Sequence, residues 1–194
     1  MNNKKLMWIL LVVIIVFAGF NIFTFFNNKT NYEQVEFTAT YIFERGIKTK
    51  IENVVLFSYE KESDLEESLK YFNGVSAEEK KKNYVEVLTK LEEQAERDIE
   101  LLEYDSFARL ENGMLQIEET NTVTGMVAET ETGWITGFGE NKLELKENTN
   151  SKLVFILPED AVIISADPEP SQKLGNVLTW QNVGQIRFPK VEYQ

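Results

Sequence analysis

The feature of this sequence that most constrains its fold is an uncharged run of 21 residues that begins at Leu6 and ends at Phe26. At a rise of about 1.5 Å per residue, a helix of this length spans roughly 31 Å, which matches the hydrocarbon core of a bilayer. We therefore expect residues 1–26 to be a cytoplasmic tip and a transmembrane signal anchor in contact with the lipid bilayer. Residues 27–31 are then a linker, and residues 32–194 are the folded domain.

The charges beside this run predict its orientation. Lys4 and Lys5 precede the run, whereas Lys29 alone follows it closely. By the positive-inside rule, the N-terminus stays in the cytoplasm and the C-terminal domain of this single-pass protein lies outside the cytoplasmic membrane. A cleaved secretory signal is the alternative, but the run exceeds the usual length of about 7–15 apolar residues and no A-x-A triplet ends it.

The chain contains no cysteine and no histidine. Disulfides, thiol nucleophiles, Ser-His-Asp triads and zinc sites built from cysteine or histidine are therefore excluded. The sequence also lacks the glycine pattern of a phosphate loop and the D-x-[DN]-x-[DN]-G pattern of a calcium loop. We accordingly expect no cofactor, no metal site and no catalytic residue.

The net charge of the chain narrows the class of partner. The whole chain carries −12, and residues 1–29 hold three lysines and no acidic residue, so residues 30–194 carry −15. A field of this sign repels phosphate backbones and anionic headgroups, which excludes nucleic acid as a partner and disfavours docking on a lipid surface. Cationic partners remain open, and so does a simple role in solubility.

The first part of the folded domain has the pattern of a β-hairpin. Apolar and polar residues alternate over residues 35–43, which predicts a strand with one buried face. Residues 51–59 are rich in β-branched and aromatic side chains, and they predict a second strand. Arg45 and Gly46 lie between the two segments and supply the turn.

Two helical patterns follow, and each begins with a serine that has a glutamate three residues later, at Ser63 and at Ser76. They predict helices over residues 63–74 and 77–103. The apolar stripe of the second helix packs on the protein's own sheet or against a partner helix, and its irregular spacing favours the sheet. Its charged side chains, including that of Lys80, are expected to face solvent.

The rest of the chain is expected to form strands. Asn112 and Gly113 predict a tight hairpin turn, and residues 118–132 are expected to form one extended, bulged strand. Short apolar runs separated by turn signals over residues 143–193 predict an antiparallel, sandwich-like layer, with Pro189 confining the last segment to an edge. The predicted fold class is thus α+β: the transmembrane helix, a strand hairpin, a helix pair and a C-terminal antiparallel sandwich-like β layer.

The segment 133–139 alternates glycines with aromatic residues in a chain otherwise poor in glycine. Its two aromatic residues, Trp134 and Phe138, are candidates for an interaction loop, because amphipathic aromatic side chains at a loop tip bind sugars, peptides or lipids. The alternative, which we favour, is a hairpin corner whose aromatic side chains pack into the core.

Three C-terminal segments carry a resemblance to a known family: residues 157–162 (LPEDAV), residues 175–180 (GNVLTW), and Phe188 with Pro189. They resemble a pattern in uncharacterised prokaryotic proteins that have one N-terminal membrane helix and a domain of unknown function. The resemblance implies an anchored, extracytoplasmic α+β domain. It carries no catalytic residue over to this chain.

Two hypotheses of function follow from the sequence. The first is a non-catalytic interaction or assembly module that offers its acidic domain to another envelope protein. The second is a small carboxylate-dependent hydrolase that acts on envelope glycans, for which two carboxylates on either side of a cleft suffice. A cleft with two facing carboxyl groups, one of raised pKa, would favour the hydrolase.

Overall fold

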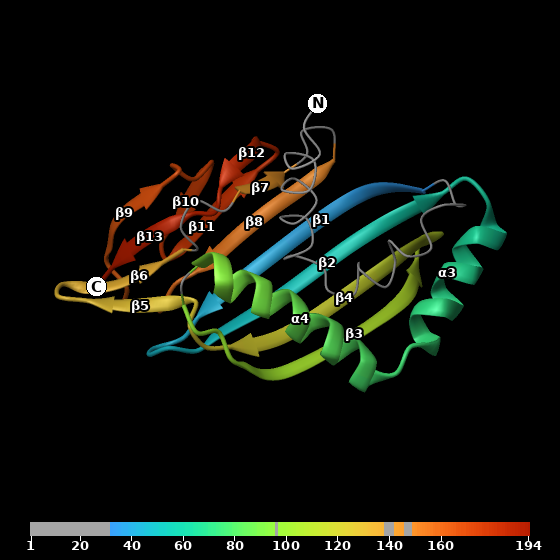
Figure 1. Cartoon of the computed structure of the whole chain (residues 1–194). Helices are drawn as coiled ribbons and strands as arrows, with labels where there is room; N and C mark the ends of the chain where they lie inside the picture. Colours follow the sequence, from blue (N-terminus) through green and yellow to red (C-terminus); the bar gives the residue numbers. More distant parts are fainter. Residues whose placement is uncertain (1–31, 96, 138–141, 146–148) are drawn as a thin grey trace, which may run out of the picture.

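The computed structural model describes residues 32–95, 97–137, 142–145 and 149–194 (Figure 1). The predicted transmembrane helix at residues 6–26 and the linker at 27–31 lie outside this part of the chain. No helix within the described residues is long and apolar enough to cross a membrane.

The largest element is a seven-stranded sheet in the order β10-β11-β8-β1-β2-β4-β3. Neighbouring strands run antiparallel, with the exception of β1 and β8, which are parallel. In chain order its strands are β1 (Tyr32–Phe43), β2 (Thr49–Tyr59), β3 (Leu101–Glu111), β4 (Met114–Val123), β8 (Asn150–Ile156), β10 (Gln172–Leu174) and β11 (Val177–Gln181).

Two smaller sheets complete the β structure. One has the order β5-β6-β13-β9, and the other pairs β7 with β12. Their strands are β5 (Val127–Thr130), β6 (Gly133–Thr136), β7 (Lys142–Leu145), β9 (Ile163–Asp167), β12 (Gly184–Arg187) and β13 (Lys190–Tyr193). Phe188, just before β13, packs its ring against Tyr41 of β1 and Phe155 of β8, with centroid distances of 5.4 and 5.6 Å. The C-terminal strands therefore share one apolar core with the large sheet.

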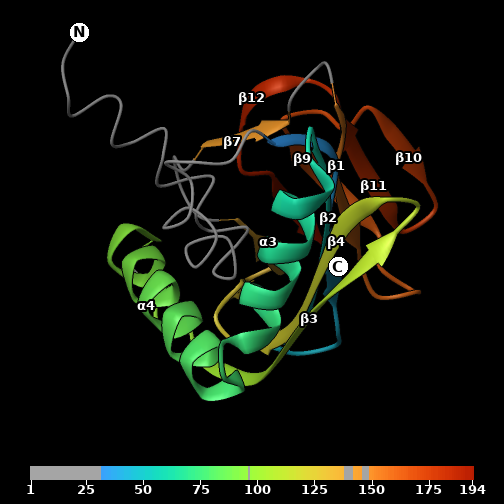
Figure 2. The same ribbon diagram turned by 90° about the vertical axis from the view of Figure 1, so that its right-hand side faces the viewer.

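Two helices lie on one face of the large sheet, at its β2-β4-β3 side (Figures 1 and 2). They are α3 (Glu62–Gly74) and α4 (Ala77–Ala95). The helix α3 buries Leu65 and Phe72, and α4 buries Tyr84, Leu88 and Leu91 against the core. The domain is thus mostly β with one helix pair, which agrees with the predicted α+β class.

The local predictions for hairpins are confirmed. β1 and β2 pair from Tyr32 opposite Tyr59 to Phe43 opposite Thr49. Asn112 has a φ of 51°, and the next residue, Gly113, has a φ of 77°, as the tight turn between β3 and β4 requires.

The capping prediction is confirmed for α4 and wrong for α3. The backbone N–H of Glu79 donates to Ser76 Oγ at 3.2 Å, so Ser76 caps α4. The N-cap of α3 is Lys61, which makes no side-chain capping bond, and Ser63 lies inside the helix. The prediction that the second helix extends to residue 103 is also wrong, because Leu101 already pairs with β4 as the first residue of β3.

Three predictions about the C-terminal strands need correction. The single strand expected over residues 118–132 is two strands, because the chain turns at Gly125 (φ 82°) between β4 and β5. The layer is not wholly antiparallel, since β8 joins the large sheet parallel to β1. Pro189 does not confine the last segment to an edge, because it separates β12 from β13 and β13 lies between β6 and β9.

Candidate functional site: the Trp134 cleft

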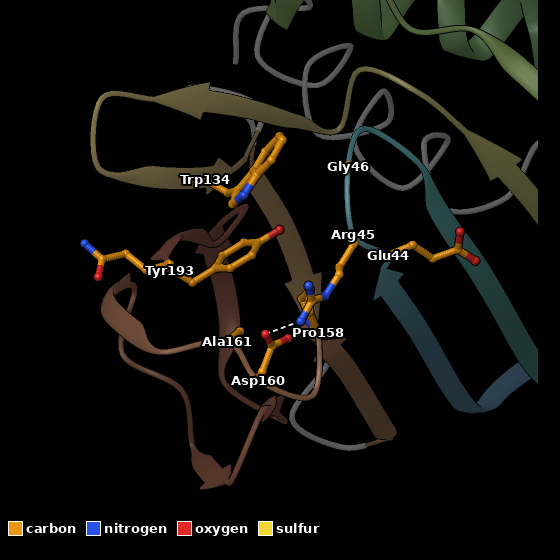
Figure 3. A pocket seen from close by; sticks show the side chains of 9 residues that line it. Glu44, Arg45, Gly46, Trp134, Pro158, Asp160, Ala161 and Tyr193 are labelled. Carbon is orange, nitrogen blue, oxygen red and sulfur yellow. Dashed lines mark hydrogen bonds and ion pairs between the residues drawn. The ribbon is translucent and has the colours of Figure 1, made fainter.

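A cleft of about 270 Å³ opens where the β1–β2 turn and the β8–β9 loop meet the end of the four-stranded sheet (Figure 3). We call it the Trp134 cleft. Its volume lies just below the range of roughly 300–1,000 Å³ that is usual for ligand pockets, so it fits a small group or one end of a larger ligand. Its lining residues are Glu44, Arg45, Gly46, Trp134, Pro158, Asp160, Ala161, Tyr193 and Gln194.

Two aromatic side chains form one side of the Trp134 cleft (Figure 3). Trp134 of β6 and Tyr193 of β13 are register partners in the four-stranded sheet. Trp134 is half-buried and packs against the core, while Tyr193 is buried. Burial raises the pKa of the Tyr193 hydroxyl to about 12, so it stays protonated at neutral pH and can donate a hydrogen bond.

The close approach of these two strands depends on Gly133, the first residue of β6. Its φ is +153°, a conformation that residues with a side chain rarely adopt. A Cβ atom at this position would lie 2.3 Å from the carbonyl oxygen of Tyr193. Only glycine therefore allows β6 and β13 to meet as they do beside Trp134.

An exposed ion pair forms the other side of the Trp134 cleft. The Arg45 guanidinium donates to the Asp160 carboxylate and joins the β1–β2 turn to the β8–β9 loop. This hydrogen bond holds the pKa of Asp160 below its usual value of 3.8, so Asp160 is ionised at neutral pH. The pair offers the spare N–H groups of Arg45 and the spare lone pairs of Asp160 to a polar ligand.

The structure brings one of the two predicted interaction residues into this cleft. Trp134 lines it, and its ring is neither fully buried nor at a free loop tip. Phe138 lies outside the described residues, so its role stays a prediction. Arg45 was expected only in a turn, and no local pattern could have joined it to Asp160, since 115 positions separate the two residues.

A group of polar side chains lies buried between the helices and the large sheet. Glu119 on β4 is 1% exposed and accepts a hydrogen bond of 2.8 Å from the hydroxyl of Tyr104 on β3. Lys80 on α4 is 6% exposed, and its ammonium lies 3.9 Å from the centre of the Phe72 ring. Burial lowers the pKa of Lys80, while the nearby charges of Glu119 and Asp105 oppose that shift.

This group corrects one expectation from the sequence, because Lys80 does not face solvent. It also contains Glu119, which no sequence motif singled out and which is buried. The sequence pattern of β4 did indicate that Glu119 is buried, because Leu115, Ile117 and Val123 are buried at alternate positions of this strand. Glu119, with the same period of two, had to share that inner face.

No three His, Cys, Asp or Glu side chains of the described part are arranged to hold a metal ion. Within the Trp134 cleft, the groups that can act on a ligand are the Trp134 ring, the Tyr193 phenol, the Arg45–Asp160 ion pair, the Glu44 carboxylate and the Gln194 amide. This set suits binding through stacking and hydrogen bonds.

Sequence comparison places residues 32–194 in a single family, described as a domain of unknown function, DUF4897. The chain belongs to this family. The relation to a domain of unknown function that the C-terminal segments suggested is thereby confirmed, and the family covers the whole domain expected after the linker. No curated protein sequence matches the chain.

The solved structures that are similar to this DUF4897 domain include the NMR structure of the folded domain of LppM from Mycobacterium tuberculosis. The two sequences are 8% identical, and the match covers 87% of this chain and 95% of that one, with a TM-score of 0.46.

Proposed function

We propose that this chain is a membrane-anchored interaction or assembly module at the outer face of the cytoplasmic membrane. In this proposal, residues 6–26 span the bilayer, and the domain binds another envelope protein through the Trp134 cleft without catalysing a reaction. The acidic domain, with its net charge of −15 over residues 30–194, disfavours nucleic acid and anionic lipid as the bound partner.

The observation that carries this proposal is the position of the Trp134 cleft relative to the start of the domain. β1 begins at Tyr32, directly after the expected linker, and its 12 residues extend roughly 40 Å at about 3.3 Å per residue. The cleft is lined by residues 44–46, which follow the other end of this strand. A domain anchored before Tyr32 can therefore hold the cleft far from its attachment point, where a neighbouring protein can reach it.

The alternative, a carboxylate hydrolase acting on envelope glycans, has less support. A glycosidase of this kind needs a carboxyl group with a raised pKa as its general acid. Two carboxylates, Glu44 and Asp160, line the cleft, and Asp160 has the opposite perturbation, because its hydrogen bond with Arg45 lowers its pKa. The aromatic rings beside it suit binding whether or not a bond is cleaved.

The proposal can be tested by photocrosslinking the full chain in its own membrane. A benzoylphenylalanine placed at Trp134 is expected to crosslink one envelope protein. The same residue at Phe107, an exposed aromatic on β3, is the matched control and should crosslink it weakly or not at all. Equal crosslinking at both positions, together with cleavage of cell-wall glycan by the purified protein, would replace the module with the hydrolase.

A further inference from the structure

The strand β9 has an open edge. It is the last strand of the four-stranded sheet and pairs, among the described strands, with β13 alone. The pairing extends one residue before β9, where Val162 and Gln194 exchange backbone hydrogen bonds of 2.9 and 3.0 Å. The backbone groups on the other side of β9 are therefore available to a further strand.

The N-terminal part of this edge is apolar. Val162 and Ile164 are 63% and 50% exposed, on either side of the half-buried Ile163. The register with β13 shifts at Ile164, so the alternation ends there and Ser165 is exposed as well. Natural edge strands are usually protected by charged side chains or by a β-bulge. The other edge strands of the two larger sheets are β3, β5 and β10, and each carries such charges. β9 has no charge before its last residue, Asp167, and carries the bulge at Ile164 instead.

The Trp134 cleft lies at the N-terminal end of β9. Asp160 and Ala161, two of its lining residues, immediately precede Val162. The aromatic side of the cleft, Trp134 on β6 and Tyr193 on β13, lies on the other side of β9 from its open edge. A segment paired with this edge would therefore meet the cleft only at Asp160 and Ala161. In strand addition, main-chain hydrogen bonds supply the affinity.

Acidic residues lie at both ends of this edge, which selects the charge of the partner. Glu159 and Asp160 precede β9, while Asp167 ends it and Glu169 follows. Arg45 pairs with Asp160, and Arg187 pairs with Asp167 at 2.8 Å, so two acidic side chains remain in excess of these bases. A partner segment with basic residues at its ends complements this arrangement.

A second copy of this chain is disfavoured as the occupant by the same charges. If two copies of β9 paired antiparallel, Glu159 and Asp160 of one copy would lie beside Asp167 and Glu169 of the other. Each domain also carries a net charge of −15 over residues 30–194, which opposes their approach.

We propose that the open edge of β9 binds an extended segment of the envelope partner by strand addition. The segment has apolar side chains at alternate positions and lysine or arginine at its ends, and one of these ends lies beside Asp160 at the rim of the Trp134 cleft. This inference rests on the proposed function and names the partner's chemistry and its mode of binding.

The test measures binding of a fluorescent peptide, KKVTVTVKK, to the full chain in nanodiscs of neutral phosphatidylcholine. We expect saturable binding at low ionic strength that weakens as salt is added. Two control peptides separate the contributions. EEVTVTVEE reverses the end charges, and KKVPVPVKK removes two backbone donors, so each is expected to bind at least tenfold more weakly.

Two lysine substitutions locate the binding edge. Ile164→Lys adds a charge to the β9 edge and is expected to weaken binding of the basic peptide at least tenfold. Leu174→Lys adds the same charge to β10, an edge of the large sheet where Leu174 is 71% exposed, and should leave binding within twofold. Both positions are exposed, so both variants should fold, which thermal unfolding checks.

Three results would overturn the inference. They are the absence of saturable binding, equal binding of the acidic and basic peptides, and equal weakening by Ile164→Lys and Leu174→Lys. Self-association of the full chain that Ile164→Lys abolishes would also overturn it, since the occupant would then be a second copy. If position 134 still crosslinks an envelope protein, the proposed function survives and only the mode of binding is wrong.

Discussion

Replacing Gly133 with alanine should separate β6 from β13 and destabilise the domain. The substitution forces a side chain onto a φ of +153°, which costs roughly 1–3 kcal/mol. The new Cβ atom also lies 2.3 Å from the carbonyl oxygen of Tyr193, so the strands must move apart by about 1 Å. If two backbone hydrogen bonds weaken, each adds about 1 kcal/mol. The total is about 4 kcal/mol.

The matched control is Gly113→Ala. Gly113 also has a positive φ, of +77°, but no atom lies within 4 Å of a Cβ built there. This variant should therefore lose only about 1 kcal/mol, the cost of the backbone conformation. In a domain of this size, 1 kcal/mol lowers the melting temperature by about 2–4 °C.

Thermal unfolding followed by circular dichroism compares the two variants directly. We expect a loss of about 8–16 °C for Gly133→Ala and of about 2–4 °C for Gly113→Ala. Equal shifts would show that the contact with Tyr193 has no energetic consequence. The argument that glycine is required beside Trp134 would then be refuted.

Three further predictions concern the core, the tyrosines and a helix cap. Tyr104→Phe removes the hydroxyl that donates to the buried Glu119 and should cost about 1–3 kcal/mol in chemical denaturation, and an unchanged midpoint would contradict this. Burial raises the pKa of Tyr59 and of Tyr193 to about 12, so the folded state keeps protons that the unfolded chain loses above pH 10. The free energy of unfolding should therefore fall from pH 10 to about pH 12. A denaturation midpoint that stays constant over this range would refute the prediction. Ser76→Ala removes the cap of α4 and should cost about 1 kcal/mol, whereas Ser63→Ala, inside α3, should cost less, and the reverse order would show that the cap was misassigned.

The elements that the sequence predicted well are those fixed by local chemistry. The β1–β2 hairpin follows from alternation and a short turn, and the turn at Asn112 and Gly113 follows from their tolerance of positive φ. The cap at Ser76 follows from a hydroxyl within reach of the amide three residues later. In each case the interacting groups are close in sequence, so a pattern can encode them.

The helix prediction failed where tertiary pairing overrides local spacing. Ile99 and Leu102 continue the apolar stripe of α4, and helical spacing alone would extend the helix to residue 103. The chain turns back instead, and the backbone N–H of Ile99 donates to the Glu92 carboxylate at 2.7 Å. Pairing of β3 with β4 then satisfies the backbone from Leu101 onward.

The buried Glu119 was missed for a different reason. A glutamate in a strand is usually solvated, so composition gave it no significance. Its burial follows from its register, since it lies on the inner face of the sheet with Ile117 and Val123. Two groups from other elements offset the cost of burying this carboxylate. The hydroxyl of Tyr104 donates a hydrogen bond to it, and the ammonium of Lys80 supplies a nearby opposite charge.

The Trp134 cleft exists because β1 and β8 are parallel. Parallel strands end at the same edge of a sheet, and Ile42 of β1 is the register partner of Ile156 of β8. The residues after each strand must therefore emerge together, which brings Arg45 within reach of Asp160. An antiparallel C-terminal layer, as the sequence predicted, does not impose this meeting. The parallel pairing of β1 with β8, which the sequence could not predict, also determines where the cleft lies. It forms at the C-terminal end of β1, which is the end remote from the segment expected to anchor the chain.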